Sequence, residues 1–208
     1  IHALNRAMCE AMIEALLSWR GDDAVKSVLI DHAGERGFCA GGDIRMIAES
    51  GAGDASEARA FFLAEYRLNH LMFDYPKPIT AIVDGIVMGG GVGISEPADV
   101  RIATERTTYA MPETGIGLFP DVGGGYFLSR CPGHVGEYLA LTGHVMGAAE
   151  AVAYGLADVI APADRLPDAW TALQQIEAPN PEAFAAAWQR WMDAAGWVRQ
   201  VAADAPLL

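Results

Sequence analysis

Residues 111–125 read Met-Pro-Glu-Thr-Gly-Ile-Gly-Leu-Phe-Pro-Asp-Val-Gly-Gly-Gly, an apolar, glycine-rich stretch that contains two acids, Glu113 and Asp121. A solvated loop would carry more polar residues, and a core strand would carry neither acids nor this many glycines. Acids in apolar, tightly turning backbone predict a cavity, where burial and a nearby like charge raise carboxyl pKa values and suit these groups to acid, base or nucleophilic work. The alternative is that both acids cap turns, because Asp and Glu beside Gly and Pro are ordinary turn residues.

Two more glycine-rich loops precede this stretch, and each follows an apolar strand. The loop of residues 33–43 follows a predicted strand at 28–30, and the loop of residues 85–93 follows one at 79–83. Glycine permits positive φ angles and close backbone approach, so such loops can turn their N–H groups toward a ligand. For the first loop, a flexible connection is the alternative.

Helical spacing of apolar residues predicts amphipathic helices over 4–19 and 57–73, the second with Ser56 as a candidate N-cap. A strand, a glycine loop and a helix thus occur twice, which indicates an α/β fold. The other expected elements are strands at 100–103 and 108–110, helices at 126–130, 135–141, 148–154 and 181–203, and a linker at 49–56.

Composition narrows the class of protein. With 208 residues, 52% of them hydrophobic, the chain can bury the core of one sizeable domain or two small ones. Its 27 acidic and 14 basic residues give a net charge of -13, which argues against nonspecific binding to nucleic acid or to an anionic membrane. No segment reaches the roughly 18 apolar residues of a membrane helix, so we expect a soluble protein.

Cysteine, histidine and nucleotide-binding patterns predict no cofactor. Cys9, Cys39 and Cys131 suggest neither a disulfide framework nor a zinc site, which fits a reducing cytoplasm. The five histidines show no metal-ligand spacing, so no metal is expected. Gly-x-Gly-x-x-Gly, the nucleoside triphosphate loop and Gly-x-Ser-x-Gly are all missing.

The glycine loops together offer two backbone amide donors beside acids, which is what chemistry on an activated carbonyl requires. Three segments resemble the crotonase (enoyl-CoA hydratase/isomerase) superfamily: Gly-Phe-Cys-Ala-Gly-Gly-Asp-Ile at 37–44, Asp-Gly-Ile-Val-Met-Gly-Gly-Gly-Val-Gly at 84–93 and Met-Pro-Glu-Thr at 111–114. Glu65-Tyr66 and residues 115–125 resemble the 3-hydroxyisobutyryl-CoA hydrolase branch of that family.

The resemblance assigns roles residue by residue. It implies oxyanion-binding amides at Ala40 and Gly90, a catalytic carboxylate at Glu113 and a second, substrate-contacting acid at Asp121. It also places Glu65 against the bound acyl group, although the residues around Glu65 alone predict a solvated helix position. The remaining substrate contacts that it implies are at Gly41, Gly89, Gly90 and Asp43.

Gly93 separates the activities of the family. The resemblance implies a glutamate there in hydratases, which use paired glutamates, so simple two-glutamate hydration is not expected. We expect thioester hydrolysis, in which Glu113 attacks the carbonyl to give a mixed anhydride or activates a water. Asp121 would bind the β-hydroxyl of the substrate or assist protonation of the thiolate. Coenzyme A is then part of the substrate.

Other functions stay open at this point. A different crotonase enzyme is one, since dienoyl-CoA isomerases resemble this chain at Asp121 but have an acid in place of Gly93. The others are an acyl-CoA hydrolase with another acyl preference and a catalytically silent acyl-CoA-binding or assembly subunit.

The resemblance also implies the architecture. We expect a crotonase-like spiral of ββα units in a catalytic core over residues 1–166, followed by a helical C-terminal segment over 167–208. The family begins upstream of Ile1 and its hydrolase branch continues past Leu208, so both ends of the fold are expected to be truncated. Assembly as a trimer or hexamer, a place in valine catabolism and a cytoplasmic location complete these expectations.

Overall fold

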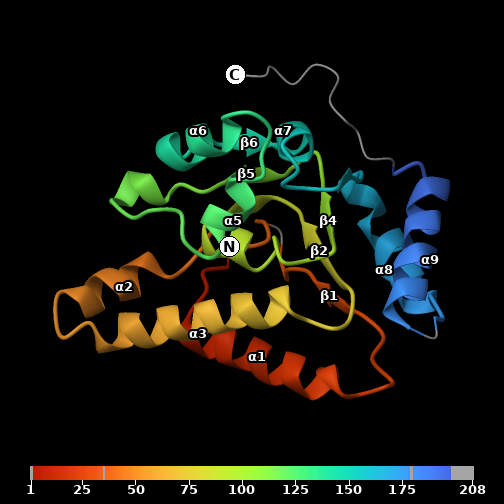
Figure 1. Cartoon of the computed structure of the whole chain (residues 1–208), viewed down its shortest axis with the longest axis horizontal. Coiled ribbons are helices and arrows are strands. Elements are labelled where there is room, and N and C mark those ends of the chain that lie inside the picture. The colour runs from red at the N-terminus through yellow and green to blue at the C-terminus, as the bar shows by residue number, and fades with distance from the viewer. Residues whose placement is uncertain (1, 35, 179, 198–208) are drawn as a thin grey trace.

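Parallel strands form the centre of the fold (Figure 1) in a computed structural model that describes residues 2–34, 36–178 and 180–197. One sheet has the order β1-β2-β4-β7 with every pair parallel. A second sheet has the order β3-β5-β6, with β3 and β5 parallel and β6 antiparallel to β5. The strands are β1 (Val28–Ile30), β2 (Ile79–Val83), β3 (Ile86–Met88), β4 (Val100–Ala103), β5 (Thr108–Ala110), β6 (Met146–Gly147) and β7 (Val159–Ile160).

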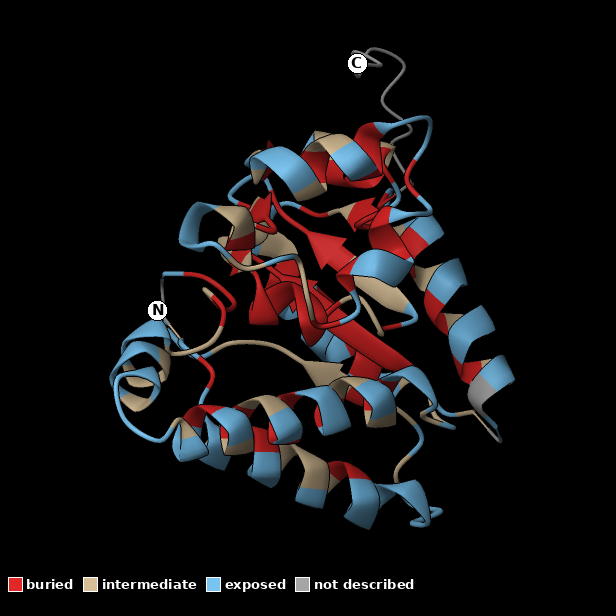
Figure 2. Cartoon of the chain, turned by 60° about the vertical axis from the view of Figure 1, so that its left-hand side comes forward, coloured by how far each residue is buried: buried red, intermediate tan, exposed pale blue. Residues whose placement is uncertain are grey.

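Both faces of the larger sheet are covered. All five residues of β2 are buried, and its side chains alternate between two apolar clusters, as the period of a strand requires. Ala81 and Val83 belong to the cluster that includes α1 (Arg6–Arg20) and α3 (Ser56–Phe73). Ile82 belongs to the cluster with α8 (Leu166–Gln175) and α9 (Pro181–Ala194). Figure 2 shows the sheet as the buried centre, with the helices exposing their outer faces.

The first long helix confirms the predicted amphipathic pattern. α1 begins after Asn5, whose side chain accepts a hydrogen bond from the Met8 N–H at 3.0 Å, and it runs beside α3 at the edge of the molecule (Figure 1). Leu16 lies on the inner face of α1 and is 2% exposed.

Ser56 is not the N-cap of α3. It is the first helical residue, and Ala55 precedes it in a left-handed conformation with φ 59°. The side chain of Asp54 accepts a hydrogen bond from the Ser56 N–H at 2.9 Å, so the capping acceptor comes from an earlier residue. The predicted linker is also partly wrong, because α2 (Ile44–Gly51) extends into it.

The strands at 100–103 and 108–110 have the predicted bounds, and the helices predicted at 126–130, 135–141 and 148–154 are present within two residues of those bounds, whereas α2, β6 and β7 were not predicted. β3 lies inside the second glycine loop, where no strand was predicted. The others are α4 (Gly90–Gly93), η1 (Glu113–Ile116), α5 (Gly124–Leu128), α6 (Val135–Thr142), α7 (Ala148–Ala153) and η2 (Ala163–Arg165).

The C-terminal helices pack on the sheet through aromatic residues. Trp188 and Met192 are each 1% exposed, and the ring of Trp191 stacks on Trp188 at 5.1 Å. The predicted helix over 181–203 is present to Ala194, and its last six positions lie outside the described residues. The division at residue 166 stays a prediction. None of the described helices combines the length and the apolar character needed to cross a membrane.

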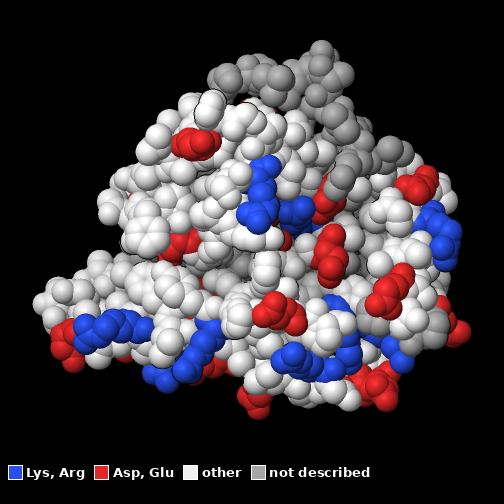
Figure 3. All heavy atoms as spheres, in the orientation of Figure 1, with Lys and Arg blue, Asp and Glu red and all other residues white. Residues whose placement is uncertain are grey.

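Charged side chains of both signs lie on the surface. On the face shown in Figure 3, Lys and Arg side chains alternate with Asp and Glu side chains along the lower edge of the molecule, where α1 and α3 run. The net charge of -13 is therefore not gathered into one acidic patch on this face.

Candidate active site

Backbone hydrogen bonds hold the first two glycine loops against each other. The Cys39 N–H donates to the Ile86 carbonyl, and the Met88 N–H donates to the Cys39 carbonyl, both at 2.9 Å. Gly37 makes this approach possible: its φ is 125°, and a Cβ there would lie 2.1 Å from the Ile86 nitrogen. Residues 40–42 therefore lie directly beside Gly89 and Gly90.

A cavity of about 300 Å³ lies at this junction, and three acids from separate elements reach it. Glu65 comes from the middle of α3, Glu113 begins η1, and Asp121 follows in an irregular loop. The structure thus brings together the three predicted acids. The cavity is also lined by Ala40, Gly41, Gly42, Ile44, Ile47, Phe61, Phe62, Gly89, Gly90, Pro112, Gly115, Ile116 and Leu118.

Glu113 is buried against the second glycine loop. It is 7% exposed, and a Cβ on Gly89 would lie 2.6 Å from its Oε1, so only glycine leaves room for the carboxyl group. Its Oε2 is buried without a hydrogen-bond partner among the described residues. Burial, followed by the charge of Asp121, raises the pKa of Glu113 to about 7. Near neutral pH this acid therefore exists in both protonation states.

Glu65 is buried more deeply, at 2% exposed. Its Oε1 has no hydrogen-bond partner among the described residues and would lie 2.4 Å from a Cβ on Gly90. Burial, the charge of Asp121 and the charge of Glu113 raise the pKa of Glu65 to about 8. At neutral pH Glu65 is mainly a neutral acid that can donate a hydrogen bond, so the position is not the solvated one that the surrounding residues predict.

Asp121 is held by a residue that sequence reasoning did not single out as functional. The hydroxyl of Tyr66 on α3 donates to Asp121 Oδ2 at 2.7 Å. The backbone after Asp121 turns through Val122 at φ 43° and Gly123 at φ 93°, and a positive φ at a β-branched residue is a true outlier. The Glu65-Tyr66 pair supplies the signal, since Glu65 lines the cavity and Tyr66 is the hydrogen-bond partner of another cavity acid.

The two predicted oxyanion amides differ in their surroundings. The Gly90 N–H begins α4 and has no hydrogen-bond acceptor in the part of the chain that the structure describes, as expected for the first residue of a helix. The Ala40 N–H donates to the His2 carbonyl at 2.9 Å. The role of Ala40 stays a prediction that requires this bond to open, whereas Gly90 is available as it stands.

Of the other predicted contacts, Gly41 and Gly89 line the cavity. Asp43 does not: its side chain accepts a hydrogen bond from the Met46 N–H at 3.1 Å and caps α2. A substrate contact for Asp43 stays a prediction. Within residues 2–34, 36–178 and 180–197, no group of three or more His, Cys, Asp or Glu side chains is placed to hold a metal ion.

Val122 fills the space beside Gly93. A Cβ on Gly93 would lie 2.5 Å from the Val122 Cβ and 2.8 Å from its Cγ2. Any side chain at position 93 would therefore overlap the valine, and an acid could enter only if the strained loop moved. Sequence reasoning used the missing acid at 93 but did not find the valine that takes its place.

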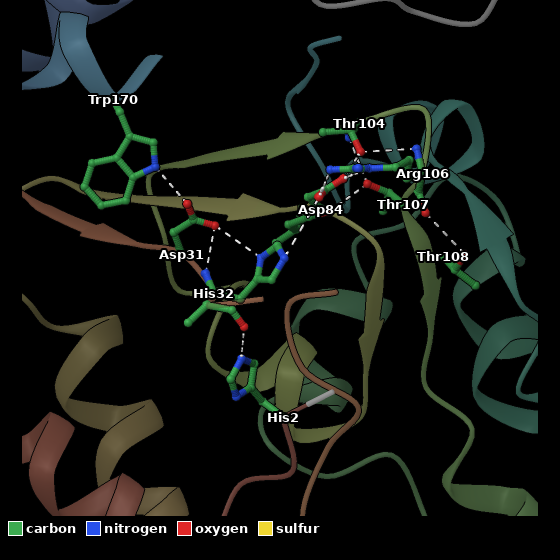
Figure 4. Close-up of polar contacts among 11 residues, drawn as sticks. His2, Asp31, His32, Asp84, Thr104, Arg106, Thr107, Thr108 and Trp170 are labelled. Carbon is green, nitrogen blue, oxygen red and sulfur yellow. Dashed lines mark hydrogen bonds and ion pairs between the residues drawn. The ribbon is translucent and has the colours of Figure 1, made fainter. Parts of the chain in front are cut away.

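A polar network fixes the start of the second glycine loop (Figure 4). Asp84, which directly precedes Gly85, accepts hydrogen bonds from Thr104 and from Arg106, the latter through Nε at 3.0 Å and Nη2 at 2.5 Å. Burial would raise the pKa of Asp84, but the bonds from Arg106 and Thr104 outweigh it and hold this pKa below its ordinary value. His32 lies on the other side, with its Nε2 4.0 Å from Asp84 Oδ2.

Family membership follows from comparison with known proteins. The enoyl-CoA hydratase/isomerase family model matches residues 1–203. The chain belongs to this family. It is also similar to a solved carnitinyl-CoA dehydratase from Mycobacterium thermoresistibile, with a TM-score of 0.83 and 44% identity over 92% of this chain and 54% of that one. The predicted crotonase fold is confirmed.

Curated relatives agree with the predicted branch. The mitochondrial 3-hydroxyisobutyryl-CoA hydrolase of Gallus gallus is 41% identical over 185 residues, which are 89% of this chain and 48% of that protein. A ribosomal protein of Neurospora crassa, mS47, is 41% identical over 86% of this chain and 38% of its own length. The chain spans about half the length of the curated hydrolases it matches.

The predicted cytoplasmic location is wrong on this comparison. The hydrolases of Gallus gallus, Xenopus tropicalis and Homo sapiens are all named as mitochondrial proteins. Three reduced, unpaired cysteines fit either compartment, so cysteine usage had no power to separate them.

Proposed function

We propose that this chain carries the catalytic core of a CoA-thioester hydrolase that acts on 3-hydroxyisobutyryl-CoA, a reaction of valine catabolism. The main support for this proposal is the buried Glu113 carboxyl group, which faces Gly89 in the cavity that Gly90 also lines. One oxygen of this group has no hydrogen-bond partner among the described residues. The names and identities of the curated relatives support the substrate.

In the proposed mechanism, the thioester oxygen binds the Gly90 N–H and a second amide, for which Ala40 is the predicted donor. Ionised Glu113 then attacks the carbonyl carbon, the C–S bond breaks, and the leaving thiolate takes a proton from neutral Glu65. Water hydrolyses the resulting mixed anhydride to the Glu113 carboxylate and the product acid, and this step returns the proton to Glu65. Glu113 could instead act as the base for a water that attacks directly, and the same residues serve both routes.

The other two acids have separate tasks in this proposal. Asp121 accepts a hydrogen bond from the substrate's β-hydroxyl. Glu65, neutral at pH 7 because its pKa is about 8, donates a hydrogen bond toward the acyl group. One anionic nucleophile and one neutral donor can then act in the same cavity.

The test compares the full-length protein with its Glu113→Gln variant on two substrates. Free thiol released from 3-hydroxyisobutyryl-CoA is followed with a disulfide reagent, and loss of crotonyl-CoA is followed by the enoyl absorbance. We expect thiol release without enoyl loss, and at least about a 100-fold lower rate in the variant, because a positioned base or nucleophile contributes at least that much.

Two controls make this test specific. Glu14→Gln changes an exposed acid of α1 and should keep the full rate. A blank without substrate corrects for the native cysteines, which are buried at Cys9, Cys39 and Cys131. Near-full hydrolysis by Glu113→Gln would refute the proposed role of this acid.

A hydratase or dehydratase activity is the second candidate, because the solved relative at 44% identity is named a carnitinyl-CoA dehydratase. Val122 in the space beside Gly93 disfavours it, since no second acid can stand there without a clash. Enoyl loss without thiol release would establish this candidate and would show that this chain does not need an acid at position 93 for hydration.

A silent binding or assembly subunit is the third candidate, supported by the likeness to the ribosomal protein mS47. Binding of acyl-CoA with no turnover of either substrate would favour it. The trimer or hexamer is likewise a proposal that rests on family resemblance, and light scattering of the full-length protein tests it.

A further inference from the structure

We propose that Tyr66 is a positioning residue for Asp121, an inference that rests on the proposed hydrolase function. The phenol donates to Asp121 Oδ2 at 2.7 Å, although the two residues are 55 positions apart. Tyr66 lies on α3 one residue after Glu65. A single turn of this helix therefore contributes Glu65, an acid of the cavity, and Tyr66, the hydrogen-bond partner of Asp121.

The backbone alone does not give Asp121 a rigid setting. Asp121 lies outside the helices and strands, and the next two residues, Val122 and Gly123, have positive φ angles of 43° and 93°. The hydrogen bond from Tyr66 therefore sets the direction of a side chain on an irregular loop. The ring of Tyr66 is itself held at 5.8 Å from that of Phe62, which lines the cavity.

Electrostatics makes this anchor necessary. Asp121 shares the cavity with Glu113 and Glu65, and its charge raises the pKa of both. When Glu113 or Glu65 ionises, its charge repels the Asp121 carboxylate. Asp121 lines both this cavity and a second hollow of about 440 Å³, which Tyr66 and Phe119 also line. Without the phenol, the carboxylate can turn farther into the second hollow and away from the substrate.

The hydrogen bond from Tyr66 also gives the two carboxylate oxygens of Asp121 different partners. Oδ2 accepts from Tyr66, which leaves Oδ1 for the β-hydroxyl of the substrate. Misplacing this contact would lower the rate of the chemical step more than substrate affinity, because small errors in position are costly in catalysis.

Tyr66→Phe removes the hydroxyl and keeps the ring contact with Phe62. In the full-length protein we expect kcat on 3-hydroxyisobutyryl-CoA to fall about 10- to 100-fold, the range for a hydrogen bond to a charged group, with KM within about threefold. Turnover of isobutyryl-CoA, which lacks the hydroxyl, should be unchanged. In an Asp121→Ala background, which has no acceptor for the phenol, the same substitution should have no further effect.

Tyr126→Phe is the matched control, since Tyr126 is a half-exposed tyrosine of α5 that borders the same second hollow. It should keep the wild-type kcat. A wild-type kcat in Tyr66→Phe, an equal loss on both esters or full additivity with Asp121→Ala would each overturn the proposal.

A measurement without turnover separates this proposal from the function on which it rests. With ¹³Cζ-labelled tyrosine, the signal missing in Tyr66→Phe identifies Tyr66, and Asp121→Asn should shift that signal. Failure to shift overturns the positioning role even in an active enzyme. A shift in a protein that hydrolyses neither ester supports the contact while refuting the hydrolase function.

Discussion

Replacing Glu65 with glutamine should stabilise the protein, and increasingly so as pH rises. Burial and two neighbouring acids raise the pKa of Glu65 from 4.5 to about 8, so the folded state holds its proton more tightly than the unfolded state does. A carboxyl group of this kind contributes its full stability below pH 4.5. That contribution is lost as pH rises through about 8, because the unfolded state releases the proton first.

The size of the effect follows from the two pKa values. Linkage gives a loss below about 1 kcal/mol at pH 5, about 3 kcal/mol at pH 7 and nearly 5 kcal/mol at pH 9. Glu65→Gln keeps the shape of the side chain and stays neutral throughout, so it escapes this loss. For a domain of about 200 residues, 3 kcal/mol corresponds to a rise in Tm of roughly 6 to 12 °C.

The assay is thermal unfolding followed by circular dichroism at pH 5, 7 and 8.5 for both proteins. Glu57→Gln is the control, because Glu57 lies on the same helix but is exposed. The difference in Tm between wild type and Glu65→Gln should widen with pH, while the control difference stays small. Equal differences at all three pH values would show that Glu65 ionises freely in the folded state, and the reasoning from burial would fail.

Two further predictions concern stability, the first through packing and the second through a network of ion pairs. Gly93→Ala should cost about 1–3 kcal/mol of stability in chemical unfolding, because its Cβ would lie 2.5 Å from the Val122 Cβ; a Gly93→Ala/Val122→Ala double variant should recover most of that loss, and simple additivity would contradict the clash. Arg101→Met should cost about 3–5 kcal/mol, because Arg101 contacts Glu96 at 2.6 Å and Asp158 at 2.9 Å in a half-buried network. A change of urea midpoint no larger than that of a surface variant would contradict this second prediction.

Sequence reasoning predicted well where one local signal decides the structure. The apolar period of 3.6 over residues 4–19 predicted α1, although Asn5 was not identified as its N-cap. The run of residues 79–83, apolar except for Thr80, predicted β2, which is buried along its whole length. The glycines at 37 and 89 indicated close backbone approach, and a Cβ at either would meet an atom within 2.6 Å.

The parts that could not be predicted depend on contacts between distant segments. β3 lies inside a glycine loop, and it becomes a strand because Cys39 and Thr108 supply backbone partners from elsewhere in the chain. Glu65 looked solvated for the same reason: a helix face carries no local sign that two glycine loops will cover it. Ala40 looked free until the His2 carbonyl was seen to accept its N–H.

The protonation states of the acids in the cavity connect these findings to the proposed reaction. Thioester hydrolysis needs an anion to attack the carbonyl and a proton for the group that leaves. Because Asp121, Glu113 and Glu65 share one small cavity, full ionisation of all three would place three negative charges together out of water, which is costly. The pKa values of about 7 for Glu113 and about 8 for Glu65 express that cost. At neutral pH the site therefore contains Glu113, which can ionise for attack, and Glu65, which still holds its proton. It has both without any second acid at position 93.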